Sequence, residues 1–396
     1  MALMSGQRSL VWALALLNTV AYGVLYYAQP LLAVQFEQAH GWTRSQTSLA
    51  FTLALLVTAF TAPRLGRTLD ERGGRSLLAL GAALGAISFA LLALSSTLWL
   101  FTSAWLLAGV AMGLTFYEAT FTVLGQHIQG ANRTGATLTI TLIAGRASTI
   151  FVPLITALLQ GTGLLPTLLI ISSLLLLCSV VVWRVVPLGN GQSHARQRVP
   201  FTQDAFFRLV TTAFTLTRVV MLGLGLQLVP MLLHDGYLPA HAAWIAGLMG
   251  AAALPGRMLF VPALGRLGVL RLTTLLVLML LMATGLMILP HDTWLVLLAT
   301  PLFGIANGAL TLARAELLVA HYHPQVFGSV NGQISWWVNL AQAMTPFGMG
   351  WLFARSASYQ PSLWMLVGLT LTAVITMAHL QRLDQVTPQI TPASTP

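Results

Sequence analysis

The feature that most constrains this chain is a series of apolar stretches, each long enough to cross a lipid bilayer. A membrane-spanning helix needs about 20 apolar residues. Charges, prolines, glycines and small polar clusters divide the sequence into twelve such stretches. Their expected limits are residues 9–33, 46–66, 76–95, 98–124, 134–159, 164–187, 205–233, 241–262, 272–289, 293–318, 327–353 and 362–382. The sequence therefore predicts an all-α polytopic membrane protein with 12 transmembrane helices.

The scarcity of charge excludes most classes of soluble protein. Only 7% of the 396 residues are charged and 57% are hydrophobic, whereas a soluble globular protein carries about 25% charged residues. A single cysteine, Cys178, allows neither an internal disulfide nor a multi-thiolate metal site. The sequence contains no nucleotide-binding loop and no catalytic constellation. We expect a protein that is not an enzyme and that holds no cofactor and no metal.

The positive charge of the chain follows its predicted topology. All 19 basic residues are arginines. With the N-terminus placed in the cytoplasm, 13 arginines fall on the cytoplasmic side, 2 fall outside and 4 lie within spans. Cytoplasmic loops of membrane proteins carry such a bias. Both termini are therefore expected in the cytoplasm, the bacterial inner membrane is the expected location, and nucleic acid is not expected as a partner.

A polar stretch and an internal repeat divide the chain into two halves. Gly109-x3-Gly113 in the fourth span recurs as Gly304-x3-Gly308 in the tenth span, 195 residues later. Repeated halves are the organisation of many secondary transporters. The expected domains are two pseudo-symmetric six-helix bundles at residues 1–187 and 205–382, a cytoplasmic linker at 188–204 and a cytoplasmic tail at 383–396.

The loop between the second and third spans carries a motif. It contains Gly66, Asp70, Gly73 and Arg75, which are a glycine, an acidic residue four positions on, and then glycine and arginine. This pattern resembles the loop signature of the major facilitator superfamily (MFS), although Glu71 stands where that family usually has a basic residue. Together with the twelve spans and the repeat, the resemblance covers essentially the whole chain. It implies the MFS fold.

The resemblance also implies a mechanism. Members of this family are secondary transporters whose two halves rock around a central site. In them the loop between spans two and three helps to lock the outward-facing state, so Gly66, Asp70, Gly73 and Arg75 are gating candidates. Asp70 can accept hydrogen bonds from the N-terminus of a neighbouring helix. Because the chain has no ATP-binding motif, an ion gradient, most simply of protons, is expected to drive transport.

Polar and aromatic residues in certain spans are substrate-binding candidates by resemblance. The family lines its cavity from spans one, four, seven and ten, with residues from two, five, eight and eleven. Hydrogen bonding between helices is the alternative role for such residues. Tyr22, Tyr26 and Gln29 recur at i, i+4 and i+7 and are expected on one helix face. The remaining candidates are Tyr117, Gln227, Asn307, Trp337 and Asn339.

Six ionisable residues lie within the predicted spans, where a charge costs at least about 2.5 kcal/mol. Glu118 is either a proton carrier, since a carboxyl group in a low-dielectric cavity can load and release H⁺, or an ionised partner for Arg146 or Arg133. Arg146, the deepest of the six, either binds an anionic substrate or is the counter-ion of Glu118. The other four are Arg218 in span seven and three gate or anchor candidates near span ends, Arg257, Arg314 and Glu316.

Two transport functions stay open on sequence. An exporter of small amphipathic compounds fits the aromatic set and the single deep acid, whereas a carrier for a small organic or inorganic anion fits the four arginines within the spans. A membrane receptor or scaffold without transport activity is a third alternative, disfavoured because such short loops offer little surface to a soluble partner. We favour efflux, and we expect a monomer whose partners are a small-molecule substrate, protons and the lipid bilayer.

Overall fold

A computed structural model of the chain describes residues 5–188, 204–289, 293–323 and 326–386. Within these ranges every regular element is a helix. The chain divides into two compact units, Met1–Phe201 with Leu318–Ala343, and Thr202–Leu317 with Met344–Pro396. Most of the predicted linker at 188–204, and the predicted tail from residue 387 on, lie outside the described residues.

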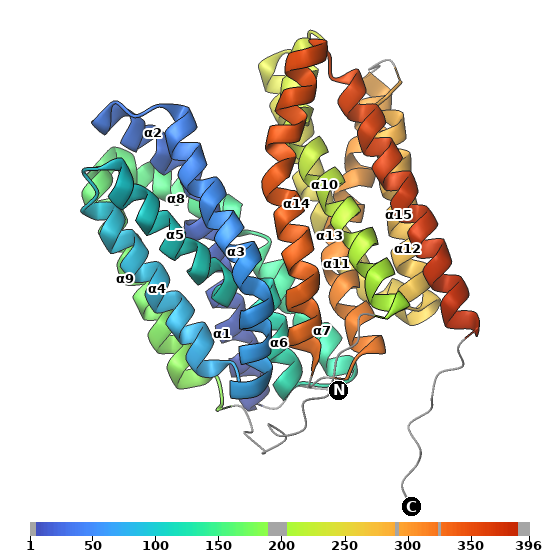
Figure 1. Cartoon of the computed structure of the whole chain (residues 1–396), viewed down its shortest axis with the longest axis horizontal. Coiled ribbons are helices and arrows are strands. Elements are labelled where there is room, and N and C mark those ends of the chain that lie inside the picture. The colour runs from blue at the N-terminus through green and yellow to red at the C-terminus, as the bar shows by residue number, and fades with distance from the viewer. Residues whose placement is uncertain (1–4, 189–203, 290–292, 324–325, 387–396) are drawn as a thin grey trace, which may run out of the picture. The chain divides into compact units, whose positions relative to one another are not determined.

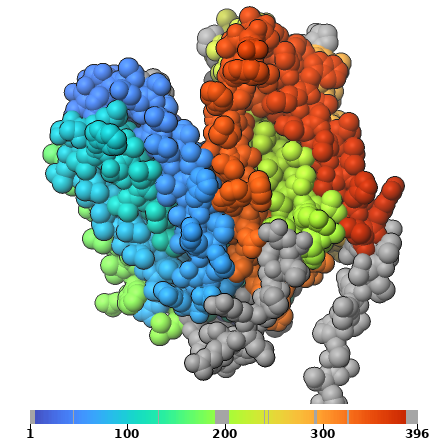
Figure 2. Space-filling view, in the orientation of Figure 1, coloured from blue at the N-terminus to red at the C-terminus, as the bar shows by residue number. Residues whose placement is uncertain are grey.

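The first unit contains the helices of the first six predicted spans (Figure 1). They are α1 (Ser5–Ala21), the π-helix η1 (Tyr22–Tyr27), α2 (Gln29–His40), α3 (Arg44–Arg72), α4 (Arg75–Ala93), α5 (Leu98–Thr115), α6 (Tyr117–His127), α7 (Ala131–Ala144), α8 (Ala147–Thr162) and α9 (Leu164–Val185). Helix α4 packs against α5 and α9, and α3 packs against α5. Side chains of α3, α4 and α5 all lie on the face of this unit seen in Figure 2.

The second unit is built around α10 and α15, which pack along each other, with α12 against α15. Its elements are α10 (Ala205–His234), α11 (Pro239–Leu267), α12 (Val269–Leu286), α15 (Gln360–Val386) and most of α13 (Thr293–His321). The division between the units runs through α13 and α14 (Phe327–Ser356). The end of α13 from Leu318, and α14 as far as Ala343, group with the first unit.

These helices confirm the predicted fold class. Eleven helical segments among the described residues are long and apolar enough to cross a membrane, and α14 corresponds to the remaining predicted span. Several helices extend beyond the predicted limits, because polar residues at the end of an apolar stretch can continue the helix. The second span was expected to end at residue 66, for example, whereas α3 continues to Arg72.

The internal repeat marks equivalent close contacts between helices. A Cβ atom on Gly109 of α5 would collide with the carbonyl group of Ala54 on α3, and one on Gly304 of α13 would collide with that of Met249 on α11. Both residues of the second contact follow those of the first by 195 positions. Small residues let membrane helices approach closely. The repeated glycines are therefore the points at which α3 meets α5 and α11 meets α13.

We expect Gly109→Ala to lower the midpoint of thermal unfolding in detergent, because the new methyl group must push α5 away from α3. Overpacking of this kind costs about 1–3 kcal/mol, which exceeds the roughly 1 kcal/mol that alanine gains over glycine within a helix. The matched control is Gly135→Ala in α7, where no neighbouring atom lies within 4 Å of the new Cβ. Equal midpoints for the two variants would contradict the proposed contact.

Candidate functional site

Three membrane helices of the first unit are interrupted midway. The first span changes from α-helix to π-helix over Tyr22–Tyr27. The fourth span breaks at Phe116, whose backbone is extended (φ −78°, ψ −179°). The fifth span breaks between α7 and α8 at Arg146 (φ −91°, ψ 2°). Irregular backbone at membrane depth is tolerated only where protein buries it or where it lines a water-filled cavity.

Aromatic rings bring the first two interruptions together. Tyr22 at the start of η1 stacks on Phe116 with a centroid distance of 4.0 Å, and its ring lies 4.8 Å from that of Tyr117. The π-helix also packs against α8. Phe151 of α8 fills the space that a side chain at Gly23 of the π-helix would occupy. The breaks of spans one and four therefore meet, and the helix that follows the third break packs against the same π-helix.

A buried asparagine ties the first span to the fourth. Asn18 is completely buried, and its amide nitrogen donates to the Thr120 hydroxyl in α6 at 2.6 Å and to the Leu14 carbonyl at 3.0 Å. The amide oxygen of Asn18 has no hydrogen-bond partner among the described residues. A buried acceptor in that state costs about 1–3 kcal/mol. Asn18 is one of the polar residues of the first span that the sequence offers either for the cavity or for hydrogen bonding between helices, and its contact with Thr120 is of the second kind.

The π-helix changes the predicted arrangement of Tyr22, Tyr26 and Gln29. Spacing of i, i+4 and i+7 places side chains on one face only at 3.6 residues per turn, and a π-helix, with i→i+5 hydrogen bonds, is wound more widely. Tyr26 contacts Tyr27 and, at 5.7 Å between ring centroids, Phe51 of α3. Gln29 is buried at the start of α2. The predicted α-helical face is thus interrupted by the π-helix, and the substrate-binding roles of the three residues stay predictions.

Glu118 lies in the first turn of α6, two residues after the break at Phe116. A carboxylate is favoured there by the partial positive charge of a helix N-terminus. The residue lines a cavity of about 20 Å³ together with residues of α3, α5 and α14, and such a cavity holds roughly one water molecule. Asn331 of α14 also lines the cavity and donates to the Glu118 carbonyl oxygen at 3.5 Å. The acid thus lies beside space for a water with which it can exchange a proton.

Asp70 holds the start of α14 against the end of α3. Its carboxylate accepts hydrogen bonds from the backbone N–H groups of Gly328 (3.0 Å) and Ser329 (2.7 Å), and from the Ser329 hydroxyl (3.0 Å). We call these three hydrogen bonds the Asp70 clamp. Gly66 packs directly on the Gly328 carbonyl group, so the two helices touch without intervening side chains. The predicted hydrogen bonding of Asp70 to a helix N-terminus is confirmed.

Two other residues of the loop motif, Gly73 and Arg75, lie at helix ends. Gly73 ends α3 with φ 75°, a conformation that glycine adopts at little cost. Arg75 begins α4, and its guanidinium group stacks over Trp183 of α9 at 4.7 Å. Arg133, directly before the fifth predicted span, is only 4% exposed and stacks over Phe327 of α14 at 4.6 Å. Arg133 therefore supports the same end of α14 as the Asp70 clamp.

The remaining substrate-binding candidates divide between the two units. Trp337 and Asn339 belong to the first unit, where Trp337 is 48% exposed and packs edge-on against Trp336. Gln227 and Asn307 belong to the second unit. Gln227 is buried there and donates to the hydroxyl group of Ser362 at 3.2 Å, which is the helix-bonding role.

The six charges within the spans differ in their surroundings. Glu118, Arg218, Arg257, Arg314 and Glu316 each interact with another group of the protein. The side chain of Arg146 is exposed and has no hydrogen bond or ion pair with the residues that the structure describes. Arg146 is therefore not the counter-ion of Glu118 in this structure. The gating roles of Arg257, Arg314 and Glu316 stay predictions.

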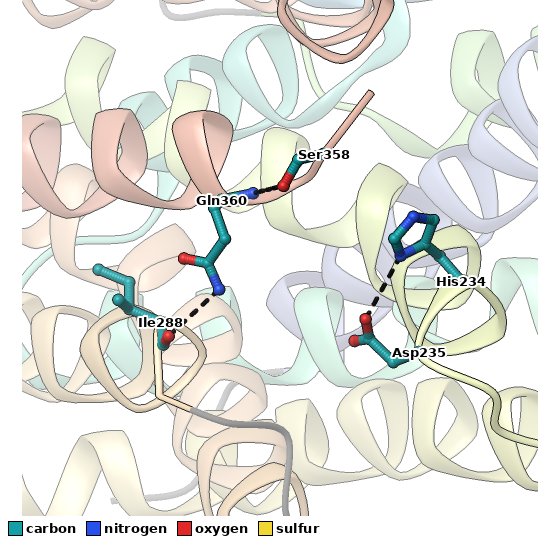
Figure 3. Close-up of polar contacts among 5 residues, drawn as sticks. All are labelled: His234, Asp235, Ile288, Ser358 and Gln360. Atoms are coloured by element: carbon teal, nitrogen blue, oxygen red, sulfur yellow. Dashed lines mark hydrogen bonds and ion pairs between the residues drawn. The ribbon is translucent and has the colours of Figure 1, made fainter. Parts of the chain in front are cut away.

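Two sets of polar contacts lie near helix ends in the second unit (Figure 3). His234 lies 3.5 Å from the Asp235 carboxylate, and its ring contacts that of Tyr359 edge-on. Burial, with the nearby Asp235 charge, raises the pKa of the Tyr359 phenol above its usual value. The Gln360 amide donates to the Ile288 carbonyl at 3.3 Å. Within the described ranges no group of three His, Cys, Asp or Glu side chains is placed to hold a metal ion.

Sequence comparisons identify relatives over most of the chain. The family model described as Major Facilitator Superfamily matches residues 11–237, more than half of the chain. The multidrug resistance protein MdtG of Dickeya zeae (strain Ech586) is 29% identical over 330 residues, which are 76% of this chain and 77% of that protein. MdtG of Salmonella arizonae (strain ATCC BAA-731 / CDC346-86 / RSK2980) is 25% identical over 395 residues, which are 94% and 95% of the two chains.

Solved structures have the same fold at low sequence identity. A bacterial homologue of the iron transporter ferroportin, in its outward-facing state, matches with a TM-score of 0.79 at 15% identity, over 96% of this chain and all of that one (100%). The human organic anion transporter MFSD10 (TETRAN) matches with a TM-score of 0.76 at 16% identity, over 94% and 99% of the two chains.

The apolar spans and the all-helical fold define a class, the multi-pass helical membrane proteins. Within that class, the family model and the relatives that align over most of the chain identify one family. The chain belongs to the major facilitator superfamily. It is a secondary transporter and binds a small-molecule substrate within the membrane.

Asp70→Ala removes all three acceptor contacts of the Asp70 clamp, so we expect faster amide hydrogen exchange at the start of α14. Hydrogen bonds to a charged group contribute about 1.5–3 kcal/mol each. Ser329→Ala removes only the hydroxyl donor and keeps both backbone hydrogen bonds, so its effect should be smaller. Exchange is measured by mass spectrometry in detergent. Unchanged exchange at the start of α14 in Asp70→Ala would show that the carboxylate does not hold this helix.

Proposed function

We propose that the protein is a proton-coupled exporter of small organic compounds, working by alternating access in a bacterial inner membrane. The observation that carries the proposal is the meeting of interrupted helices in the first unit. There Tyr22, Phe116 and Tyr117 form an aromatic surface directly before Glu118. Interrupted helices near mid-membrane build the substrate and ion sites of many secondary transporters.

The aromatic surface suits compounds that carry rings. Phe116 is buried, whereas Tyr22 and Tyr117 remain partly exposed, so a ring of the substrate can extend the existing stack. Aromatic pairs contribute about 0.5–1.5 kcal/mol beyond the area they bury. Such contacts do not depend on one hydrogen-bonding pattern, which supports a transporter of several related compounds rather than of one polar metabolite.

Glu118 is the proton carrier in this proposal. It follows Tyr117 in the chain and lines the water-sized cavity that Gly328 also lines. Gly328 is held in turn by the Asp70 clamp. Loading a proton on Glu118 removes a negative charge beside the start of α14, and this change favours release of α14 from α3. Proton binding and gating would then act on the same helix end.

The relatives support the direction of transport and the location. Both MdtG proteins are named multidrug resistance proteins, and export is how a membrane transporter lowers the internal concentration of a toxic compound. These relatives are bacterial, which favours the inner membrane, and the arginine bias favours cytoplasmic termini. We expect the transporter to act as a monomer, with both units contributing to one transport cycle.

A carrier for small anions is the second candidate function. The observation that favours it is the exposed Arg146 at the break between α7 and α8. A carrier of inorganic anions would need no aromatic surface beside that arginine, so the two functions differ in how far transport depends on Tyr22.

Tyr22→Ala removes the ring that stacks on Phe116 and should weaken binding of aromatic dyes about tenfold, the combined loss of a ring pair and its buried area. Tyr22→Phe keeps the ring and should bind within about twofold of wild type. Equilibrium binding to the purified protein is the measurement. Transport of a small inorganic anion that is indifferent to Tyr22→Ala, with no dye binding in wild type, would favour the second candidate.

Glu118→Gln should abolish proton-driven transport in proteoliposomes while sparing exchange of substrate across the membrane. The amide is nearly isosteric but carries no exchangeable acidic proton. Uptake under an imposed pH gradient and exchange without one are measured in the same vesicles. The control is Glu71→Gln, an exposed acid near the end of α3, which should retain both activities. Intact proton-driven transport in Glu118→Gln would remove Glu118 from the mechanism.

A further inference from the structure

Arg146 lies near the middle of its membrane span. The fifth span runs from Asn132 to Thr162, and Arg146 follows its first residue by 14 positions and precedes its last by 16. At 1.5 Å per residue these separations are about 21 Å and 24 Å. The backbone of Arg146 is satisfied at the break, since its N–H donates to Ile143 and its carbonyl accepts from Ile150. The side chain is therefore the group that still needs a partner.

The guanidinium group of Arg146 differs from every other charge that we singled out within the spans. The other five all interact with a group of the protein, whereas the Arg146 side chain is exposed and makes no hydrogen bond, ion pair or ring contact within the described ranges. A charge at this depth costs at least about 2.5 kcal/mol unless it faces water or a partner. Arginine keeps its charge in proteins, so it cannot escape this cost by losing a proton.

Phe151 of α8 connects the helix that follows Arg146 to the π-helix of the proposed transport site. Phe151 follows Arg146 by five residues, which is about 7.5 Å along the axis of α8, and packs against Gly23 of the π-helix. The residue before Gly23 is Tyr22, which stacks on Phe116. The break at Arg146 therefore lies roughly one and a half turns along the helix axis from Phe151, the residue of α8 that contacts the π-helix of the proposed transport site.

We propose that Arg146 is the anion-binding residue of this transport site and that the substrates are small amphipathic organic acids. A carboxylate or sulfonate group pairs with the guanidinium fork, which binds planar oxyanions through two hydrogen bonds. The aromatic or apolar part of the same compound lies against Tyr22 and its neighbours. This inference rests on the proposed transport function and adds the charge of the substrate to it.

Three probes of equal size isolate the charge, namely naphthalene-2-sulfonate, the neutral naphthalene-2-sulfonamide and the cationic 2-naphthyltrimethylammonium. Wild type should bind and transport the sulfonate best. Arg146→Gln should weaken sulfonate binding at least about tenfold, the loss of a charge-assisted pair, with little change for the sulfonamide. Arg146→Lys should recover part of the affinity. The matched control is Arg184→Gln, an exposed arginine near the end of α9, which should leave all three affinities unchanged.

The single cysteine allows a second test that does not depend on how well Arg146→Gln folds. In a Cys178→Ser background, Arg146→Cys introduces the chain's one thiol. A trimethylammonium-ethyl methanethiosulfonate reagent restores a positive charge at this position and should restore sulfonate binding. The sulfonato-ethyl reagent adds a negative charge and should not. A thiol that neither charged reagent modifies in the folded protein would place position 146 in lipid and overturn the inference.

The outcomes separate this inference from the proposed function. Equal weakening of all three probes by Arg146→Gln, or unchanged sulfonate binding, overturns the inference. A wild-type preference for the cation overturns it too, while proton-driven export of that cation leaves the proposed function standing. Sulfonate binding that requires Arg146, without proton-driven transport, supports the inference and refutes proton coupling. Binding of none of the three probes counts against both.

Discussion

An unpaired polar group inside a lipid bilayer costs several kcal/mol, and this cost organises the whole structure. Backbone groups avoid it by forming helices, which is why every regular element in the described ranges is helical. The places where the chain departs from this rule are informative. The π-helix at Tyr22–Tyr27, the extended Phe116 and the break at Arg146 all lie within spans of the first unit. Irregular backbone persists there because the surroundings satisfy it or because it faces a cavity.

The same cost applies to side chains, and it separates structural charges from functional ones. Asp70 satisfies its carboxylate with three hydrogen bonds at the start of α14, and the buried Arg133 stacks on Phe327 nearby. Both residues hold one helix end in place. Glu118 lies between that helix end and the aromatic surface at Tyr22. In the proposed mechanism, a change in its charge acts both on the start of α14 and on a substrate at the aromatic surface.

Part of the site was open to prediction because it depends on local chemistry. The Asp70 hydrogen bonds need an acid at the end of one helix and free N–H groups at the start of another. The loop motif indicates the acid, whereas only the structure shows that the donors belong to α14. The contacts of Gly109 and Gly304 follow from a repeat that is visible in the sequence. The shared face predicted for Tyr22, Tyr26 and Gln29 assumed an α-helix through residues that form a π-helix. That change coincides with packing against Phe116 and Phe151, which lie far away in sequence.

The sequence by itself determined the fold class, the number of spans, the family resemblance and the carboxylate of Asp70 as an acceptor for a helix N-terminus. Each of these conclusions depends on the length of apolar stretches or on a short motif. None of them requires knowing which residues far apart in the sequence come into contact. Only the tertiary structure decided which charges are satisfied. It buried Arg133 and left the Arg146 side chain without a partner among the described residues. Whether an arginine in a membrane protein is an anchor or a binding group depends on which neighbours folding brings to it, and residue type alone does not carry that information.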